Sequence, residues 1–249
     1  MSLTTDPTTV LATGAHRSTT EPAAEPTAEP TTAPAFTRIA AGLALVAFPL
    51  LFTAGIATSP PQASGSTADY VASLGADPSL TALSAGLLHY SWVAFALGVL
   101  ATIGLVRGRR GRVVVPVAAI LTSFSAIQLS GLLLSDWFTG AVARAMPLEA
   151  ASALTEGVWG DPWVSTWQLS GQVVGFVGIP LVIAALARAG VVSWWLLAAP
   201  VLGFAGFFVP VPGAILVGMF VSAAPMIVVG VRLIRRASPR VRREELAAA

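Results

Sequence analysis

The chain has no cysteine and no lysine, and it has few charged residues of any kind. Without cysteine it can form neither disulfide bonds nor thiolate metal sites. Charged residues make up 10% of its 249 residues and hydrophobic residues 55%, whereas an average soluble domain carries about 25% charged residues. Such a chain cannot cover its own apolar surface in water, so the composition indicates that lipid covers part of it.

All 14 basic residues are therefore arginine, and the net charge is only +2. Exclusive use of arginine is typical of a GC-rich, bacterial genome, in which case the membrane is the plasma membrane. Apart from Arg17 and Arg144, the arginines all lie at the same end of long apolar segments. Membrane orientation thus explains almost every basic residue, and the sequence predicts no nucleic-acid binding.

Six apolar segments each approach the roughly 20 residues that a membrane-spanning helix needs. The densest basic cluster, Arg107–Arg112, lies in a short connection, where the positive-inside rule applies fully. We therefore predict an all-α, polytopic membrane protein with six transmembrane helices and both termini in the cytoplasm. The predicted spans are residues 37–57, 80–106, 113–136, 166–187, 191–209 and 214–233.

The chain divides into three regions by composition. Residues 1–35 are rich in Thr, Pro, Glu and Ala and cannot bury enough surface to offset their ordering entropy, so we predict a disordered tail. Residues 36–233 form the transmembrane domain. Residues 234–249 form an Arg-rich cytoplasmic tail, which is expected to attract anionic lipid headgroups at roughly 1 kcal/mol per Arg. A cytoplasmic protein partner for this tail is the alternative.

The outer connections carry their own helix signals. Ser66 is a candidate N-cap for a helix over residues 67–74, and Asp77 with Pro78 is a candidate start for the second span. A further helix is predicted over residues 147–156, ended by Gly157. Four tryptophans around these connections indicate the outer membrane interface, with a Trp-lined ligand mouth as the alternative: Trp137, Trp159, Trp163 and Trp167.

Polar residues within the bilayer are costly and therefore indicate function or helix packing. They concentrate in the outer halves of the second, third and fourth predicted spans. We predict that these side chains converge into an outward-facing polar pocket that binds or transports a small molecule, a lipid or an ion. The candidate ligand-binding residues are His89, Gln128, Asp136, Gln168 and Gln172.

Two other interpretations of these residues remain open. They can serve as hydrogen-bonding glue between helices, in which case the protein is a non-catalytic accessory or assembly subunit with a membrane protein partner. Alternatively, His89 and Asp136 can form the centre of an outer-face enzyme. The enzyme interpretation is disfavoured, because one His in the spans cannot build a zinc or haem site and no nucleotide-binding loop is present. No cofactor is predicted.

Overall fold

The computed structural model describes residues 33–209, 211 and 213–237, in which all regular secondary structure is helical. Residue contacts divide the chain between Thr31 and Thr32, so every described residue belongs to the second unit. The predicted all-α fold is confirmed for this part of the chain. The predictions for residues 1–32 and for the end of the Arg-rich tail, residues 238–249, lie outside the described residues.

Five described helices are long and apolar enough to cross a membrane. The fifth consists of the last two helices, which are interrupted at Ala224, just before Pro225. Only together are these two helices long enough to cross a membrane. These helices are consistent with an integral membrane protein. They are α1 (Ala33–Ala57), α3 (Pro78–Ala101) extended by η1 (Thr102–Leu105), α4 (Val114–Ala145), α6 (Pro162–Arg188), and α8 (Ala214–Ala223) followed by α9 (Pro225–Ala237).

The predicted fifth span, residues 191–209, is shorter than expected. It contains η2 (Trp194–Leu197), α7 (Ala198–Ala205) and η3 (Gly206–Phe208). The helix begins late because the Ser193 side chain accepts a hydrogen bond from the Trp195 N–H, as an N-cap does. The predicted count of six spanning helices is therefore not confirmed by helix length alone.

Two shorter helices lie in the connections between the long ones. Helix α2 (Thr67–Ala76) begins after Ser66, and α3 begins after Asp77 with Pro78 in its first turn, so both predicted caps are confirmed. Helix α5 (Leu148–Trp159) continues through Gly157, where an end was expected. A glycine inside a helix costs only about 1 kcal/mol relative to alanine, too little to end a helix that other residues support.

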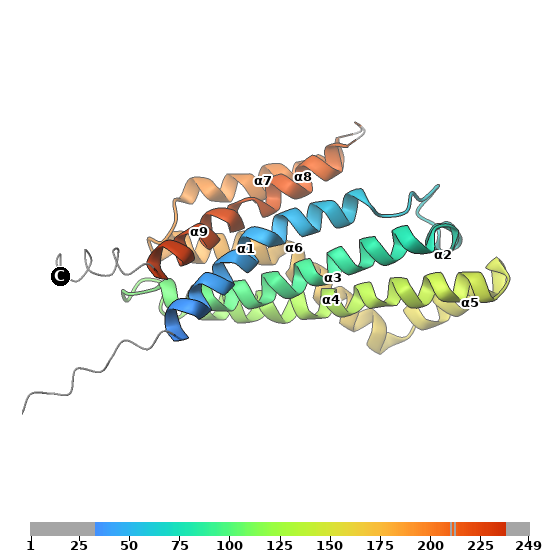
Figure 1. The fold of residues 1–249 in the computed structure, drawn as a ribbon, viewed down its shortest axis with the longest axis horizontal. Coiled ribbons are helices and arrows are strands. Elements are labelled where there is room, and N and C mark those ends of the chain that lie inside the picture. Colours follow the sequence, from blue (N-terminus) through green and yellow to red (C-terminus); the bar gives the residue numbers. More distant parts are fainter. Residues whose placement is uncertain (1–32, 210, 212, 238–249) are drawn as a thin grey trace, which may run out of the picture. The chain divides into compact units, whose positions relative to one another are not determined.

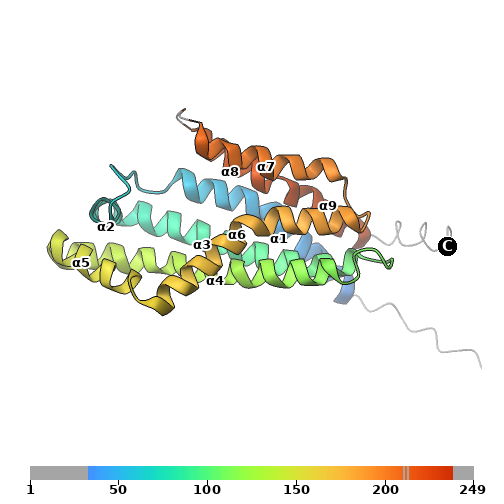
Figure 2. The ribbon, with the colours of Figure 1, turned by 180° about the vertical axis from the view of Figure 1, so that it is seen from behind.

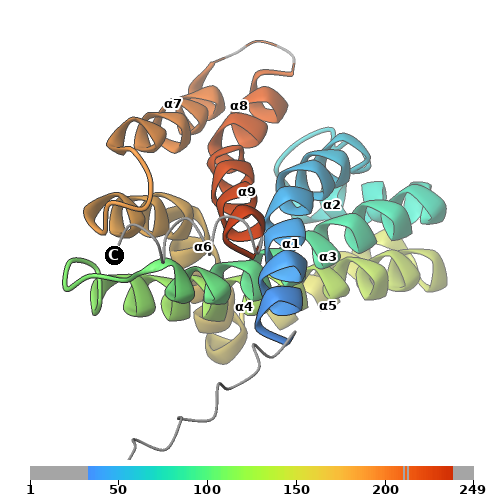
Figure 3. The same ribbon diagram turned by 60° about the vertical axis from the view of Figure 1, so that its left-hand side comes forward.

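The long helices pack as antiparallel neighbours within residues 33–237 (Figure 1). Helix α4 contacts α3 on one side and α6 on the other, while α1 contacts both α3 and α9. Helices α2 and α5 contact each other and α4 at one end of the bundle, as the reverse view also shows (Figure 2). Helices α7 and α8 form a separate antiparallel pair (Figure 3).

We call the two ends of this bundle the Arg end and the loop end. The Arg end carries Arg38, Arg107–Arg112, Arg188 and Arg232–Arg236, and the loop end is formed by residues 58–77 and 140–165. Two arginines also have structural roles at the Arg end. Arg232 donates a hydrogen bond to the Val191 carbonyl, and Arg236 donates one to the Leu105 carbonyl, so α9 is tied to the chain segments that follow α6 and α3.

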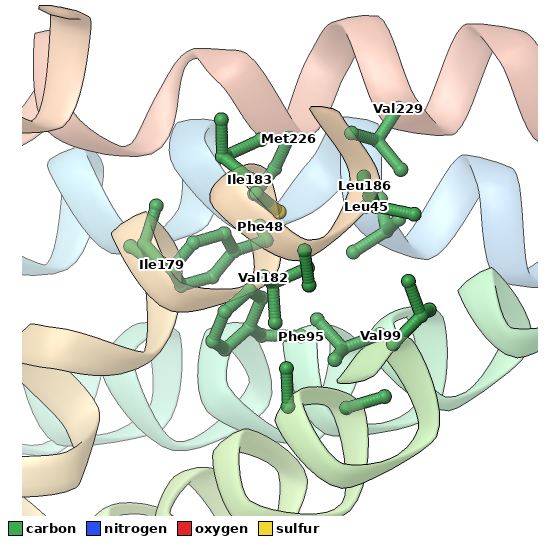
Figure 4. Packing of buried hydrophobic residues seen from close by; sticks show 14 of the residues in the cluster. Leu45, Phe48, Phe95, Val99, Ile179, Val182, Ile183, Leu186, Met226 and Val229 are labelled. Atoms are coloured by element: carbon green, nitrogen blue, oxygen red, sulfur yellow. The ribbon is translucent and has the colours of Figure 1, made fainter. Parts of the chain in front are cut away.

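The bundle interior nearer the Arg end is a continuous apolar core (Figure 4). Phe48 of α1 stacks on Phe95 of α3, with ring centroids 4.3 Å apart. Helices α6 and α9 add Ile183 and Met226, which are fully buried. Helix α4 adds Val115 and Ala119, so the described apolar core joins α1, α3, α4, α6 and α9.

Glycines bring α1 and α9 into backbone contact within this core. A Cβ atom added at Gly42 would lie 2.6 Å from the Gly230 carbonyl oxygen, and one added at Gly230 would lie 2.5 Å from the Gly42 carbonyl oxygen. Small residues allow helices to approach this closely, as in other membrane helix pairs. The first and last long helices of the described chain are thus held directly against each other.

Candidate functional site

A cavity of about 600 Å³, here called the polar pocket, lies at the loop end. Helices α2, α4, α5 and α6 and the loop before α2 form its walls. Three of the predicted site residues line it: Asp136 from α4, and Gln168 and Gln172 from α6. The polar residues of the two spans thus meet a cavity that two connecting helices complete.

The two glutamines lie one turn apart on α6, so their side chains share a helix face. Among the described residues, no hydrogen-bond partner is found for either side-chain amide. Both residues are half-buried, and each amide carries two donor hydrogens and an acceptor oxygen. These two amides are therefore available to a molecule that enters the polar pocket.

Asp136 is already engaged on one side. The Tyr70 hydroxyl of α2 donates a short hydrogen bond to Asp136 Oδ1. Burial of Tyr70, together with the neighbouring Asp136 carboxylate, raises the pKa of the Tyr70 hydroxyl far above its usual range. Tyr70 consequently keeps its proton and acts as a permanent donor, which fixes α2 over the end of the third long helix.

His89 lies outside the lining of the polar pocket. Its Nδ1 is 2.8 Å from Ser130 Oγ and 3.1 Å from the Ser130 carbonyl oxygen, so it links α3 to α4. Its ring also packs near Tyr90 and Trp137, with centroid distances of 5.0 and 6.4 Å. The structure therefore separates His89 from the candidate residues that meet in the cavity.

Gln128 also lies outside the lining of the polar pocket, and its side chain forms a hydrogen bond between α4 and α6. Its Oε1 accepts a hydrogen bond of 2.6 Å from the Ser170 hydroxyl of α6. A Cβ atom added at Gly171 would lie 3.2 Å from Gln128 Cβ, so the two helices are close at this level. Gln128 thus faces α6 directly rather than the cavity.

The hydroxyl groups around Gln128 on α4 follow the same pattern. The Ser123 hydroxyl donates to the Ala96 carbonyl of α3 at 2.9 Å. On the opposite side, the Ser125 hydroxyl donates to the Gly171 carbonyl of α6 at 2.5 Å. The middle of α4 is therefore a band of interhelical hydrogen bonds, while the end of α4 opens into the polar pocket.

Several residues of the polar pocket lie in the connection between the first two predicted spans. Gln62, Ser66, Thr67 and Tyr70 come from the loop and from α2. Their signal in the sequence was the capped helix after Ser66, which places polar side chains beside the end of a span. A capping residue predicts where α2 begins, but it does not predict that α2 packs against Asp136.

A second cavity, here called the apolar pocket, adjoins the polar pocket. It has a volume of about 200 Å³ and lies between α4, α5 and the start of α6. Leu132, Thr155 and Trp159 line both cavities. Trp167 lines the apolar pocket as well, so two of the four interfacial tryptophans border a cavity rather than only the membrane interface.

The polar pocket carries charge of one sign. Asp136 is its single ionisable carboxyl group, and no Arg or His is among its described lining residues. An anion in this cavity would meet a carboxylate without a compensating positive charge, which is unfavourable. Its amide, hydroxyl and carboxylate groups suit an uncharged hydrogen-bonding molecule or a cation.

Within the described residues there is no group of three or more His, Asp or Glu side chains that could hold a metal ion. Comparison with protein-family models, with curated proteins and with solved structures finds no match for this chain.

Proposed function

We propose that this protein crosses the plasma membrane six times and binds a small uncharged or cationic molecule in the polar pocket, from the outer side. One observation carries the proposal. The amides of Gln168 and Gln172, which have no partner among the described residues, face a cavity of about 600 Å³ whose described lining has one carboxyl group, that of Asp136. Binding is the primary role, and transport of the bound molecule is an extension of it.

Chain connectivity supports six crossings despite the short fifth segment. Helix α6 ends near Gly111 at the Arg end, where a Cβ atom added at Gly111 would lie 3.2 Å from the Ala189 Cα. The end of η3 meets the start of α8, as Gly206 packs against Ala214. Residues 194–208 therefore connect opposite ends of the bundle, and at 1.5–2.0 Å per residue they extend about 25 Å.

The arginines support an orientation with the Arg end in the cytoplasm and the loop end outside. The antiparallel contact between α1 and α9 brings Gly42 close to Gly230 and Ile234, so the start of α1 and the end of α9 lie on one side. Basic residues at that side favour retention in the cytoplasm. The polar pocket then faces outward.

The alternative role as an accessory subunit loses one of its supports. The small residues of α6 that could bind a partner helix contact α4 instead. Cβ atoms added at Gly171 and Gly178 would lie 3.2 Å from Gln128 Cβ and 2.7 Å from Thr122 Cγ2, and one added at Gly175 would overlap Leu129 Cδ1. A catalytic pair of His89 and Asp136 is also disfavoured, because His89 is hydrogen-bonded to Ser130 and Asp136 to Tyr70.

The absence of native cysteine allows the orientation to be tested with single cysteines. Gly65 at the loop end and Gly108 at the Arg end form a matched pair, because an added Cβ meets no atom within 4 Å at either position. We expect a membrane-impermeant maleimide to label Gly65→Cys on intact cells and Gly108→Cys only after permeabilisation. The reverse labelling would overturn the orientation.

The pocket is tested with Gln172→Cys and two thiosulfonate reagents of similar size. The reagent with a trimethylammonium group should modify this cysteine at least about ten-fold faster than the reagent with a sulfonate group, because Asp136 attracts one and repels the other. Ala63→Cys is the control, since Ala63 is exposed in the loop before α2 and does not line the polar pocket. Equal rates for both reagents, or no reaction at Gln172→Cys, would contradict the proposal.

A further inference from the structure

We infer that the ligand is a single-chain amphiphile without negative charge, with its headgroup in the polar pocket and its apolar chain in the apolar pocket. The inference rests on the proposed function and adds the class of ligand. It follows from the juxtaposition of two cavities of opposite character at the loop end. A small water-soluble molecule would use only the first of them.

The two cavities are continuous in their lining. Thr155 and Trp159 of α5 and Leu132 of α4 border both. The Thr155 hydroxyl donates to the Ala151 carbonyl at 2.8 Å, so it is committed to its own helix. The wall that the two cavities share is therefore largely apolar side-chain surface, and the inferred chain would cross it beside these residues.

The lining of the apolar pocket suits a hydrocarbon chain better than a polar group. Val142, Val158, Val164 and Trp167 line it from α4, α5 and α6. The hydroxyl of Ser135, which also lines it, donates to the Leu132 carbonyl at 2.5 Å. That hydroxyl and the hydroxyl of Thr155 are both satisfied internally, which leaves the Thr139 hydroxyl as the third hydroxyl of the lining. A polar ligand group here would therefore regain few of the hydrogen bonds that it loses with its hydration.

Exposed apolar side chains surround this second cavity. Phe138 is 74% exposed, and Leu154 and Val158 are each 50% exposed. All three line the apolar pocket. In a protein whose long helices are embedded in lipid, such a rim is compatible with a chain that enters from the bilayer rather than from water.

The headgroup class follows from the polar pocket. Gln168 and Gln172 offer donors and acceptors together, which match hydroxyl groups, and the Asp136 carboxylate tolerates a cation. A phosphate or sulfate headgroup would meet that carboxylate without any lining arginine. Ordinary anionic lipids are thus excluded from this site, even though the Arg end favours them.

The test measures equilibrium binding to the full chain in phosphatidylcholine nanodiscs, with protein-free nanodiscs as the blank. The probes are octyl glucoside and octyltrimethylammonium below their micelle-forming concentrations, methyl glucoside and tetramethylammonium as chain-free counterparts, and octyl sulfate. We expect at least one octyl probe to bind at least about ten-fold more tightly than its chain-free counterpart, a gain that two buried methylene groups suffice to give. Octyl sulfate should not bind.

The variant Val142→Phe fills the apolar pocket and should abolish the gain from the chain while the chain-free probe binds as before. Leu169→Phe is the control, because Leu169 is exposed and lines neither cavity. If a chain-free probe binds but the octyl chain adds nothing, or if the gain survives in Val142→Phe, the amphiphile is excluded and the proposed function stands. Binding of octyl sulfate would overturn the charge selection, and failure of every probe would overturn both proposals.

Discussion

Gln128 and Gln172 are the same residue at nearly the same level of the bundle, yet the structure gives them opposite surroundings. Gln128 packs beside Gly171 and accepts a hydrogen bond from Ser170. Gln172, the next residue after Gly171 on α6, lines the polar pocket and has no partner among the described residues. Adjacent residues of a helix point in directions about 100° apart. On α6, Gly171 therefore faces α4 and Gln128, whereas Gln172 faces the polar pocket.

The same contrast holds for the two halves of the bundle. Toward the Arg end, long helices contact each other through glycines and a continuous apolar core. At the loop end, the short helices α2 and α5 contact α4 and leave two cavities beside it. If the loop end binds the ligand as proposed, mutations can separate the packing that stabilises the Arg end from the cavities that bind.

The largest effect is expected where helix backbones touch. Gly230→Ala should lower the free energy of unfolding by about 3 kcal/mol, because the new methyl group would lie 2.5 Å from the Gly42 carbonyl oxygen and push α9 from α1. Thermal unfolding in detergent, followed by size-exclusion chromatography, measures this loss. Gly86→Ala is the matched control, since the nearest atom to its added Cβ is 3.9 Å away.

In the control, a helical alanine in place of glycine should leave the midpoint unchanged or raise it. If Gly230→Ala unfolds at the same temperature as Gly86→Ala, the close contact between α1 and α9 is not what holds the Arg end together. Reactivity of Gln172→Cys toward the cationic reagent, measured in the folded fraction, should be the same in both backgrounds.

A somewhat smaller effect is expected from Tyr70→Phe, which acts on the other half. Asp136 loses its hydroxyl donor, and a partly buried carboxylate left without one costs about 2 kcal/mol. The lost bond also supported the ionised form of the carboxyl group, so without it the cationic reagent should react more slowly with Gln172→Cys. A variant that unfolds at a lower temperature without any change in this rate would show that Tyr70 has no part in the pocket.

Much of this architecture could be predicted from the sequence because apolar length and helix caps are local signals. The four long spans before residue 190 and the caps at Ser66 and Asp77 are of this kind. The bounds of the fifth span were harder to predict, because hydropathy alone does not show that its helix begins only after Ser193. The sequence also predicted that Gly157 ends α5, because a glycine after a helical stretch is typical of a helix end, but the helix continues to Trp159.

The candidate site could be predicted only in part, for a physical reason. Periodicity shows which residues share a helix face, but it does not show how far the helix is rotated against its neighbours. Asp136, Gln168 and Gln172 face the cavity, whereas His89 and Gln128 face the adjacent helices. Tyr70 belongs to a contact between residues 66 positions apart, which no local pattern encodes.

Identical substitutions at Gln128 and Gln172 should have different effects. Gln128→Ala removes the acceptor of the Ser170 hydroxyl and should destabilise the protein by about 1 kcal/mol, typical of an interhelical hydrogen bond. Gln172→Ala removes no such bond and should leave the unfolding midpoint unchanged while weakening the binding of octyl probes. The comparison fails if both variants lose stability equally or if only Gln128→Ala alters probe binding.

The smallest effect is expected at Asp77, which lies fully outside both cavities and caps α3. Its side chain accepts a hydrogen bond from the Leu80 N–H, and this bond, with a second from the Ser79 hydroxyl, lowers the pKa of the Asp77 carboxyl. A lowered pKa in the folded state means that the stabilisation is present at neutral pH and is lost as the pH falls through the folded-state pKa. Asp77→Ala should therefore unfold slightly below wild type at pH 7, and the difference should shrink below about pH 4, near the ordinary pKa of an aspartate. Because the cap is fully exposed, the change in midpoint should be smaller than in any of the variants above that lower stability. A difference that grew as the pH fell would mean that the protonated, not the ionised, carboxyl supports the start of α3.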